Sequence, residues 1–215
     1  MQIILKKVVP VPLKEKFMQR NSDVWNCDIN FLPGEWIKIK APSGTGKTTF
    51  VHTIYKLRND YEGKVLLDGN DLRNINNGAL AILRQQNMSI IFQDLRLFSN
   101  LTAQENIELK RVMQKPLYEP AMINVFAERL NITHILQQRA GVCSYGEQQR
   151  IAIARALMQP FKWLIMDEPF SHLDNNNIAN AATLIAAECK KRNAGFILTD
   201  LEDDLHFDYS RKLNL

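Results

Sequence analysis

APSGTGKTTF, residues 41–50, is the most informative segment of the chain, because it stands between a predicted strand at 36–40 and a predicted helix at 48–58. Its small residues allow successive backbone N–H groups to turn inward around a phosphate, at the positive end of the helix dipole. This strand–loop–helix context is the one that a phosphate-binding loop requires. The segment therefore predicts a site for the phosphates of a nucleotide.

Within this loop, Lys47 can bridge the β- and γ-phosphates, and the Thr48 hydroxyl can ligate Mg²⁺. Ala41 stands where the usual pattern has its first glycine, which we expect to be tolerated because the closest amides come from residues 44–47. A glycine-bearing turn with a chance lysine is the alternative, and the complete strand–loop–helix context disfavours it. The other residues expected to contact the nucleotide here are Pro42, Ser43, Gly44, Thr45, Gly46 and Thr49.

A second motif, WLIMDEPF at residues 163–170, ends an apolar run on two adjacent carboxylates. Asp167 at the strand end can hold the Mg²⁺ shell, and Glu168 can polarise a water for in-line attack. An ordinary exit from a strand into a polar loop is the alternative. Beside a phosphate-binding loop it becomes the weaker interpretation.

Short apolar runs recur between helical stretches, which indicates an α/β core. Residues 36–40 (WIKIK) alternate like a half-buried strand, whereas 89–92 and 163–166 are continuously apolar, and 196–198 resembles them. Continuous runs of this length are typical of strands buried on both faces, as in a parallel sheet covered by helices.

The region from about 95 to 160 looks mainly helical. Thr102 with Glu105, and Ser144 with Glu147, form capping-box patterns ahead of helices predicted at 106–112 and 148–158. A further helical pattern covers 121–130. We therefore predict one unit, 1–215, in which a helical subdomain at about 95–160 is inserted between two parts of the α/β core, 1–94 and 161–215.

Composition narrows the class of protein. The chain has 215 residues, of which 46% are hydrophobic and 23% charged, as in soluble globular proteins. The net charge of +4 is the only feature that suggests a nucleic-acid ATPase. This excess is small, so we do not expect nucleic acid as a partner. The three cysteines form no CxxC pair, which favours a reducing compartment without zinc. No apolar run approaches the roughly 20 residues of a membrane-spanning helix.

Three further motifs lie between and beyond these two. Gln93 follows an apolar run in SIIFQD, CSYGEQQR occupies 143–150, and SHLD occupies 171–174. In this order the five motifs resemble those of the ATP-binding cassette (ABC) ATPases, along nearly the whole chain. The resemblance implies a P-loop NTPase core of the RecA-like type with a mainly parallel sheet, an N-terminal antiparallel β subdomain and an inserted α-helical subdomain.

The resemblance also implies how the site works. Gln93 would sense Mg²⁺ and the attacking water, acting with Lys47 and Glu168 in catalysis, and the metal would be held by Thr48, Gln93 and Asp167. Ser144, Gly146 and Asp174 would contact ATP bound by another subunit, so that two chains pair head-to-tail around two ATP molecules. An aromatic residue would stack on adenine: Phe17, with Trp25 as the competitor and core packing as the alternative for both.

Several positions depart from the family's pattern. In 143–150, Cys143, Tyr145 and Glu147 replace Leu, Gly and Gln, so we expect Tyr145 to crowd the loop and Glu147 to bring a negative charge near the phosphates. In FILTDLEDD at 196–204, Asp200 stands where the family has its switch histidine. An ionised Asp200 would repel the γ-phosphate, which predicts slow hydrolysis.

The segment QDLRLFSNLTAQENI, residues 93–107, resembles small transporter ATPases of the lipoprotein-release, cell-division and macrolide-export type. This likeness implies that a transmembrane permease subunit docks near residues 93–98, and that the chain is cytoplasmic, on the cytoplasmic face of the inner membrane. We therefore expect a transport-coupled ATPase. A nucleotide-binding regulatory module with little turnover is the alternative.

Overall fold

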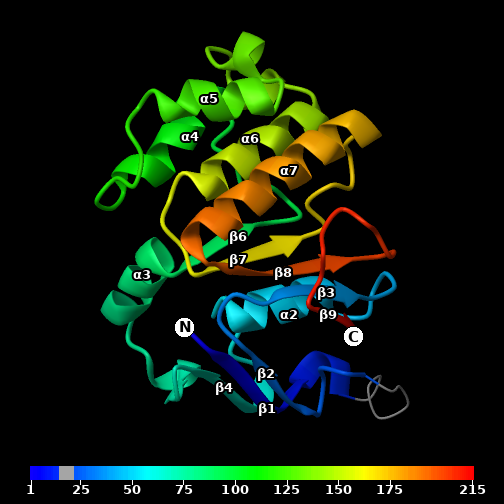
Figure 1. The fold of residues 1–215 in the computed structure, drawn as a ribbon. Helices are drawn as coiled ribbons and strands as arrows, with labels where there is room; N and C mark the ends of the chain where they lie inside the picture. Colours follow the sequence, from blue (N-terminus) through cyan, green and yellow to red (C-terminus); the bar gives the residue numbers. More distant parts are fainter. Residues whose placement is uncertain (15–21) are drawn as a thin grey trace.

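The computed structural model describes residues 1–14 and 22–215. Figure 1 shows two sheets, with α2 (Lys47–Ile54) lying between them and a layer of helices covering the far side of the larger sheet. This arrangement confirms the predicted α/β fold, with its parallel core sheet, antiparallel sheet and inserted helices.

The larger sheet carries the site. Its five strands have the order β6-β7-β8-β3-β9, and every neighbouring pair is parallel. Because the strands are parallel, their carboxyl ends meet at one edge. The strands are β3 (Trp36–Lys40), β6 (Met88–Ile91), β7 (Trp163–Asp167), β8 (Gly195–Asp200) and β9 (Arg211–Asn214).

The smaller sheet is antiparallel, with the order β2-β1-β4-β5. All four of its strands come from the first third of the chain, as the resemblance implied. The remaining strand of that third, β3, belongs to the larger sheet. They are β1 (Ile3–Pro10), β2 (Asp28–Phe31), β4 (Tyr61–Leu67) and β5 (Asn70–Asp71). One turn of 3₁₀ helix, η1 (Val11–Leu13), follows β1.

Three helices, α4, α5 and α6, lie in sequence between β6 and β7, and α7 follows β7. In Figure 1, α6 and α7 cover the parallel sheet, while α4 and α5 lie farther out. The helices other than α2 are α3 (Asn77–Gln86), α4 (Ala103–Val112), α5 (Met122–Arg129), α6 (Tyr145–Leu157) and α7 (Asn175–Arg192); three more 3₁₀ turns are η2 (Leu72–Asn74), η3 (Thr133–Ile135) and η4 (Ala140–Val142).

Helix boundaries differ from the predicted ones for identifiable reasons. Both capping boxes are present, but α4 and α6 begin immediately after their caps, Thr102 and Ser144, rather than three residues later. A capping side chain accepts an amide from the third residue of the helix, so the helix starts directly behind it. The helix predicted at 48–58 ends at Ile54, because Lys56 has φ +56° and reverses the chain.

Two hydrophobic cores occupy the two faces of the parallel sheet. Alternate residues of β8 show this division: Ile197 packs toward α2 and the antiparallel sheet, whereas Phe196 and Leu198 pack under the helical layer. The sheet is therefore held rigidly from both sides, and the loops at its carboxyl edge are fixed by it.

The prediction that β3 is half-buried is wrong. Strand β9 pairs with β3 on the side opposite β8, so β3 lies inside the sheet and Lys38 is completely buried. The Lys38 ammonium forms ion pairs with Asp204 and with Asp200, 3.3 Å from the Asp200 carboxylate. Lys38, which the alternating pattern placed on the solvent face of the strand, is thus buried and ion-paired.

Among the helices of the described residues, none combines the length and apolar character that crossing a bilayer requires.

Candidate active site

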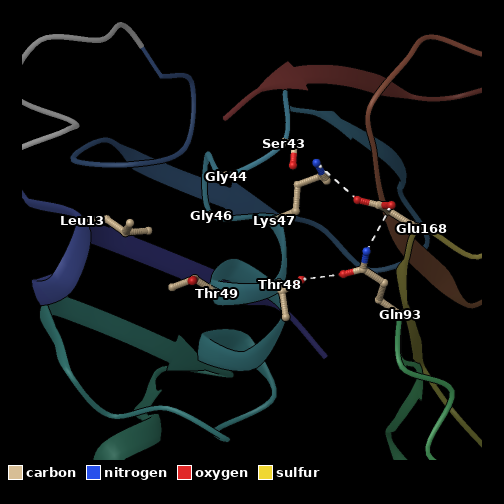
Figure 2. Close-up of a pocket in the computed structure, with 9 residues that line it drawn as sticks. All are labelled: Leu13, Ser43, Gly44, Gly46, Lys47, Thr48, Thr49, Gln93 and Glu168. Carbon is tan, nitrogen blue, oxygen red and sulfur yellow. Dashed lines mark hydrogen bonds and ion pairs between the residues drawn. The ribbon is translucent and has the colours of Figure 1, made fainter.

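The phosphate-loop segment joins β3 to α2 and forms one wall of a pocket of about 240 Å³ at the carboxyl edge of the parallel sheet (Figure 2). Gly44 and Gly46 adopt φ values of +75° and +101°, which glycine reaches without strain. Gly46 is also the N-cap of α2, so no side chain caps that helix and its first amides face the pocket region. The lining residues are Leu13, Ser43, Gly44, Gly46, Lys47, Thr48, Thr49, Gln93 and Glu168.

Four side chains form a connected network across this pocket (Figure 2). The Lys47 ammonium lies 3.3 Å from Glu168 Oε1, and Gln93 Nε2 donates to Glu168 Oε2 at 3.3 Å. The Thr48 hydroxyl donates to Gln93 Oε1 at 3.2 Å. Lys47 and Glu168, 121 positions apart along the chain, therefore meet where a phosphate would be held.

Lys47 is held by the loop as well as by Glu168. Its Nζ donates to the carbonyl oxygens of Ala41 at 2.8 Å and Pro42 at 3.2 Å. The alanine at the first glycine position thus contributes its backbone, and its buried methyl group packs in the core between the sheets. Alanine at this position therefore keeps the backbone contact to Lys47, and its tolerance for nucleotide binding stays a prediction.

Asp167 and Glu168 are adjacent in sequence but face different surroundings. Asp167 is buried, and the Thr199 hydroxyl donates to its Oδ1 at 2.7 Å. Glu168 has φ +48°, and its N–H donates to the Thr199 carbonyl at 2.9 Å, so its side chain leaves the strand direction and enters the pocket. The turn after β7 therefore leaves the Asp167 carboxylate buried behind the pocket and places the Glu168 carboxylate in the pocket lining.

The donor set of the pocket fits a magnesium ion. The described residues hold no cluster of three His, Cys, Asp or Glu side chains of the kind that binds a metal without other ligands. Mg²⁺ is usually held by only one or two protein oxygens, with water and phosphate oxygens completing its octahedron. The Thr48 hydroxyl and Gln93 Oε1 lie together on one side of the pocket and supply such oxygens.

The structure places the other expected contacts outside the pocket lining. Thr45 turns into the loop, where its hydroxyl donates to the Pro42 carbonyl at 2.6 Å, and Asp167 lies behind Glu168. Leu13, from η1, lines the side opposite Glu168 (Figure 2), and the sequence carries no signal that would have identified it.

The two candidates for adenine stacking are separated by the structure. Phe17 lies outside the described residues. Trp25 is 2% exposed, and its ring packs edge-on against Phe50, with ring centroids 5.8 Å apart. A base cannot stack on a ring enclosed in the core, so for Trp25 the core-packing alternative holds.

Ser144, Gly146 and Asp174 do not line the pocket. Ser144 caps α6, and Asp174 caps α7 by accepting the Asn177 amide at 2.9 Å. A Cβ on Gly146 would lie 3.0 Å from the carbonyl oxygen of His172, so glycine permits a close approach between α6 and the loop before α7. Ser144 and Asp174 are exposed and Gly146 is half-buried, all three outside the pocket of their own chain.

Three of the departures from the family pattern, Asp200, Tyr145 and Glu147, have defined partners. Asp200 pairs with Lys38 and does not line the pocket, so its carboxylate is directed away from the phosphate position. Tyr145 turns back onto its own chain, where its hydroxyl donates to the Gln93 carbonyl at 2.9 Å. Hydrogen bonds from the Ser144 hydroxyl and N–H hold the pKa of Glu147 below its usual value, so that carboxylate stays ionised.

Comparisons with known proteins agree with this geometry. Residues 24–171 match the ABC transporter family. The chain is 31% identical over 190 residues to the lipoprotein-releasing system ATP-binding protein LolD of Shewanella frigidimarina, covering 87% of this chain and 80% of that protein. It is 33% identical over 195 residues to the phosphonates import ATP-binding protein PhnC of Lactiplantibacillus plantarum, covering 85% and 75%.

Solved structures of MJ0796, a bacterial ABC transporter cassette, are also similar. Its dimeric structure superimposes with a TM-score of 0.77 at 25% identity, covering 92% of this chain and 87% of that one. A dimeric post-hydrolysis state of the same cassette, bound to ADP and Pi, superimposes with a TM-score of 0.74 and the same coverage.

Proposed function

Since the chain belongs to the ABC transporter family and is a transport-coupled ATPase of the ATP-binding-cassette type, we propose that it hydrolyses Mg-ATP in a head-to-tail pair and drives a separate membrane permease. The observation that carries this proposal is the connected network of Lys47, Thr48, Gln93 and Glu168 at one pocket. In this network Glu168 can act as the general base, the Thr48 hydroxyl can ligate a metal ion, and the Lys47 ammonium can bind a phosphate.

Each residue of the network has a distinct task in this proposal. The amides of the loop and the Lys47 ammonium bind the β- and γ-phosphates, with Lys47 exchanging its carbonyl partners for phosphate oxygens. Glu168 accepts the proton of the attacking water, and Gln93 orients Glu168 by donating to its second oxygen. When bound, Mg²⁺ would neutralise charge that develops on the phosphates, and Thr48, Gln93 and Asp167 would hold it.

Phe17 remains our proposed base contact. Leu13 precedes it by four residues and supplies an apolar surface on the wall opposite Glu168. The pocket itself is smaller than the roughly 300 Å³ at which sites for drug-sized ligands begin. We therefore assign the pocket to the phosphates and place the base outward, beyond Leu13.

We propose that Ser144, Gly146 and Asp174 complete the site of a second chain. Their position outside the pocket of their own chain supports this arrangement, and the similar cassette forms dimers. In this arrangement residues 1–215 act as one unit, with about 95–160 as the helical part and 1–94 with 161–215 as the nucleotide-binding core.

We place the permease contact at residues 93–98 and the chain on the cytoplasmic face of the inner membrane. Phe98 is 59% exposed, whereas Leu95 is buried in the chain's own core, so Phe98 is the apolar side chain available to a partner. One similar protein is named for lipoprotein release and another for phosphonate import. We therefore assign the choice of cargo to the permease.

Phosphate release from Mg-ATP tests the proposed reaction. We expect Lys47→Ala to abolish release and Glu168→Gln to lower it about 10²–10⁴-fold, as the loss of a general base does. The position of Asp200 supports slow hydrolysis in the wild type, because no side-chain donor stands at the switch position. Asp200→His should therefore raise turnover, and Asp200→Asn, which removes the charge without adding an imidazole, should not. Release that survives Lys47→Ala would refute the proposal.

A regulatory module with little turnover is the second candidate. The ionised Glu147 at the Ser144 cap favours it, since a fixed negative charge there opposes closure around a phosphate. This candidate predicts ATP binding by the wild type without release in any of the variants, both alone and in membranes that contain the permease.

A further inference from the structure

Tyr145, the residue that replaces a glycine of the family pattern, connects three functional segments of its own chain. It is the first residue of α6, and its hydroxyl donates to the main-chain carbonyl of Gln93 at 2.9 Å. Its ring packs on the His172 ring, with centroids 4.2 Å apart. The side chain is still 43% exposed, so burial in a core does not explain this placement.

The loop that receives this hydrogen bond is held by α6 at a second point. Leu95 and Arg96 have φ values of +57° and +49°, a backbone conformation that is unfavourable for residues with a side chain. The Arg155 guanidinium, from the last turn of α6, donates to the carbonyl oxygens of Leu95 at 2.5 Å and Arg96 at 2.6 Å. Helix α6 therefore fixes residues 93–96 at both ends.

A third contact from α6 reaches the other half of the network. The buried Gln149 amide donates to the Glu168 carbonyl at 3.2 Å, and its oxygen accepts the His172 amide at 3.2 Å. The turn between Tyr145 and Gln149 thus touches the main chains that carry both Gln93 and Glu168. A displacement of α6 would therefore change the main-chain positions of both Gln93 and Glu168.

We propose that Tyr145 is a positioning residue for the ATPase reaction: its hydroxyl sets the main chain at Gln93, and thereby the Gln93 side chain between Thr48 and Glu168. The proposal rests on the proposed function. Its hydrogen bond spans 52 residues of sequence and links α6 to the Gln93 side chain through a single peptide unit. A glycine at this position, as in the family pattern, has no side chain that could form this hydrogen bond. The contact between α6 and Gln93 therefore depends on the tyrosine of this chain.

Kinetics in a double-mutant cycle test the proposal. Tyr145→Phe keeps the ring and removes the hydroxyl, and we expect kcat to fall about threefold to tenfold, the range that one neutral hydrogen bond supports, with KM for Mg-ATP within twofold. In a Gln93→Ala background the same substitution should change kcat less than twofold, because the side chain being positioned is gone. Tyr61→Phe is the matched control, since the buried Tyr61 hydroxyl has no hydrogen-bond partner within residues 1–14 and 22–215, and Tyr61 lies on β4, away from α6 and Gln93.

Hydrogen exchange without nucleotide gives a readout that does not depend on turnover. Backbone amides in 94–98 should exchange at least threefold faster in Tyr145→Phe than in Tyr61→Phe, because the loop has lost one of its anchors. Equal exchange in the two variants would overturn the proposal. So would equal, additive effects of Tyr145→Phe on kcat with and without Gln93. Faster exchange in a protein that never releases phosphate would instead support the anchor and refute the proposed hydrolysis.

Discussion

Lys38 shows how a single buried charge organises the carboxyl edge of the sheet. A buried ammonium is costly unless it is paired and hydrogen-bonded, and Lys38 has Asp200 and Asp204 as partners. Burial alone would raise the pKa of Asp204, but hydrogen bonds from Lys38 and Tyr209 bring that pKa below its usual value. The segment after β8 is therefore tied to β3 by charge, and Asp200 is fixed away from the pocket.

Removing one carboxylate from this cluster should destabilise the fold. We expect Asp204→Asn to lower the free energy of unfolding by about 2 kcal/mol, the scale of a hydrogen bond to a charged group, with Asp200 remaining as a partner. Urea unfolding followed by far-ultraviolet circular dichroism measures it. Asp203→Asn is the matched control, because its ion pair with Lys40 is exposed and should leave the midpoint unchanged. Equal midpoints for both variants would contradict this assignment of the cluster.

The chemistry-bearing residues of the pocket are predictable from the sequence, whereas some of their neighbours are not. Lys47, Thr48 and Glu168 sit in short motifs whose local spacing already determines where they lie. Lys38 is buried only because β9, from the far end of the chain, pairs with β3. Leu13 reaches the pocket only because the antiparallel sheet packs beside α2, and neither pairing leaves a local signal.

Elements with local determinants are predicted best. The capping boxes at Thr102 and Ser144 predict α4 and α6, since both partners of each box lie within four residues. The loop after β6 is different: the direction of its side chains depends on contacts with α6, so the sequence could not separate the buried Leu95 from the exposed Phe98.

This difference makes Phe98 the sharpest test of the permease contact. Phe98→Asp should lower the fraction of chain that sediments with inner membranes of its own cell at least fivefold, because an apolar contact would have to bury a carboxylate. Leu32→Asp is a matched control: Leu32 is also exposed, and it precedes β3 at the sheet edge opposite the pocket. Since Phe98 is exposed, the unfolding midpoint should not change. Equal sedimentation of both variants would exclude Phe98 from the membrane contact.

At the scale of the whole molecule, the proposed head-to-tail pairing divides each site between two chains. The pocket holds Lys47, Gln93 and Glu168, whereas Ser144 lies at the start of α6, outside that pocket. In a two-fold symmetric pair each half-site can meet its counterpart on the other chain. A chain with a defective pocket can then still complete its partner's site.

This arrangement predicts complementation between two inactive variants. Lys47→Ala disables the pocket and Ser144→Arg disables the surface around Ser144, so each variant alone should release no phosphate. Mixed in equal amounts, half of the pairs are mixed and each has one intact site of two, which predicts about a quarter of the wild-type rate if the sites act independently. The control replaces the second variant with Lys47→Ala/Ser144→Arg, which leaves no intact site in any pair. A mixture that releases phosphate no faster than this control would mean that Ser144 does not complete the partner's site. Neither a pocket completed within one chain nor a parallel pair allows one variant to rescue the other.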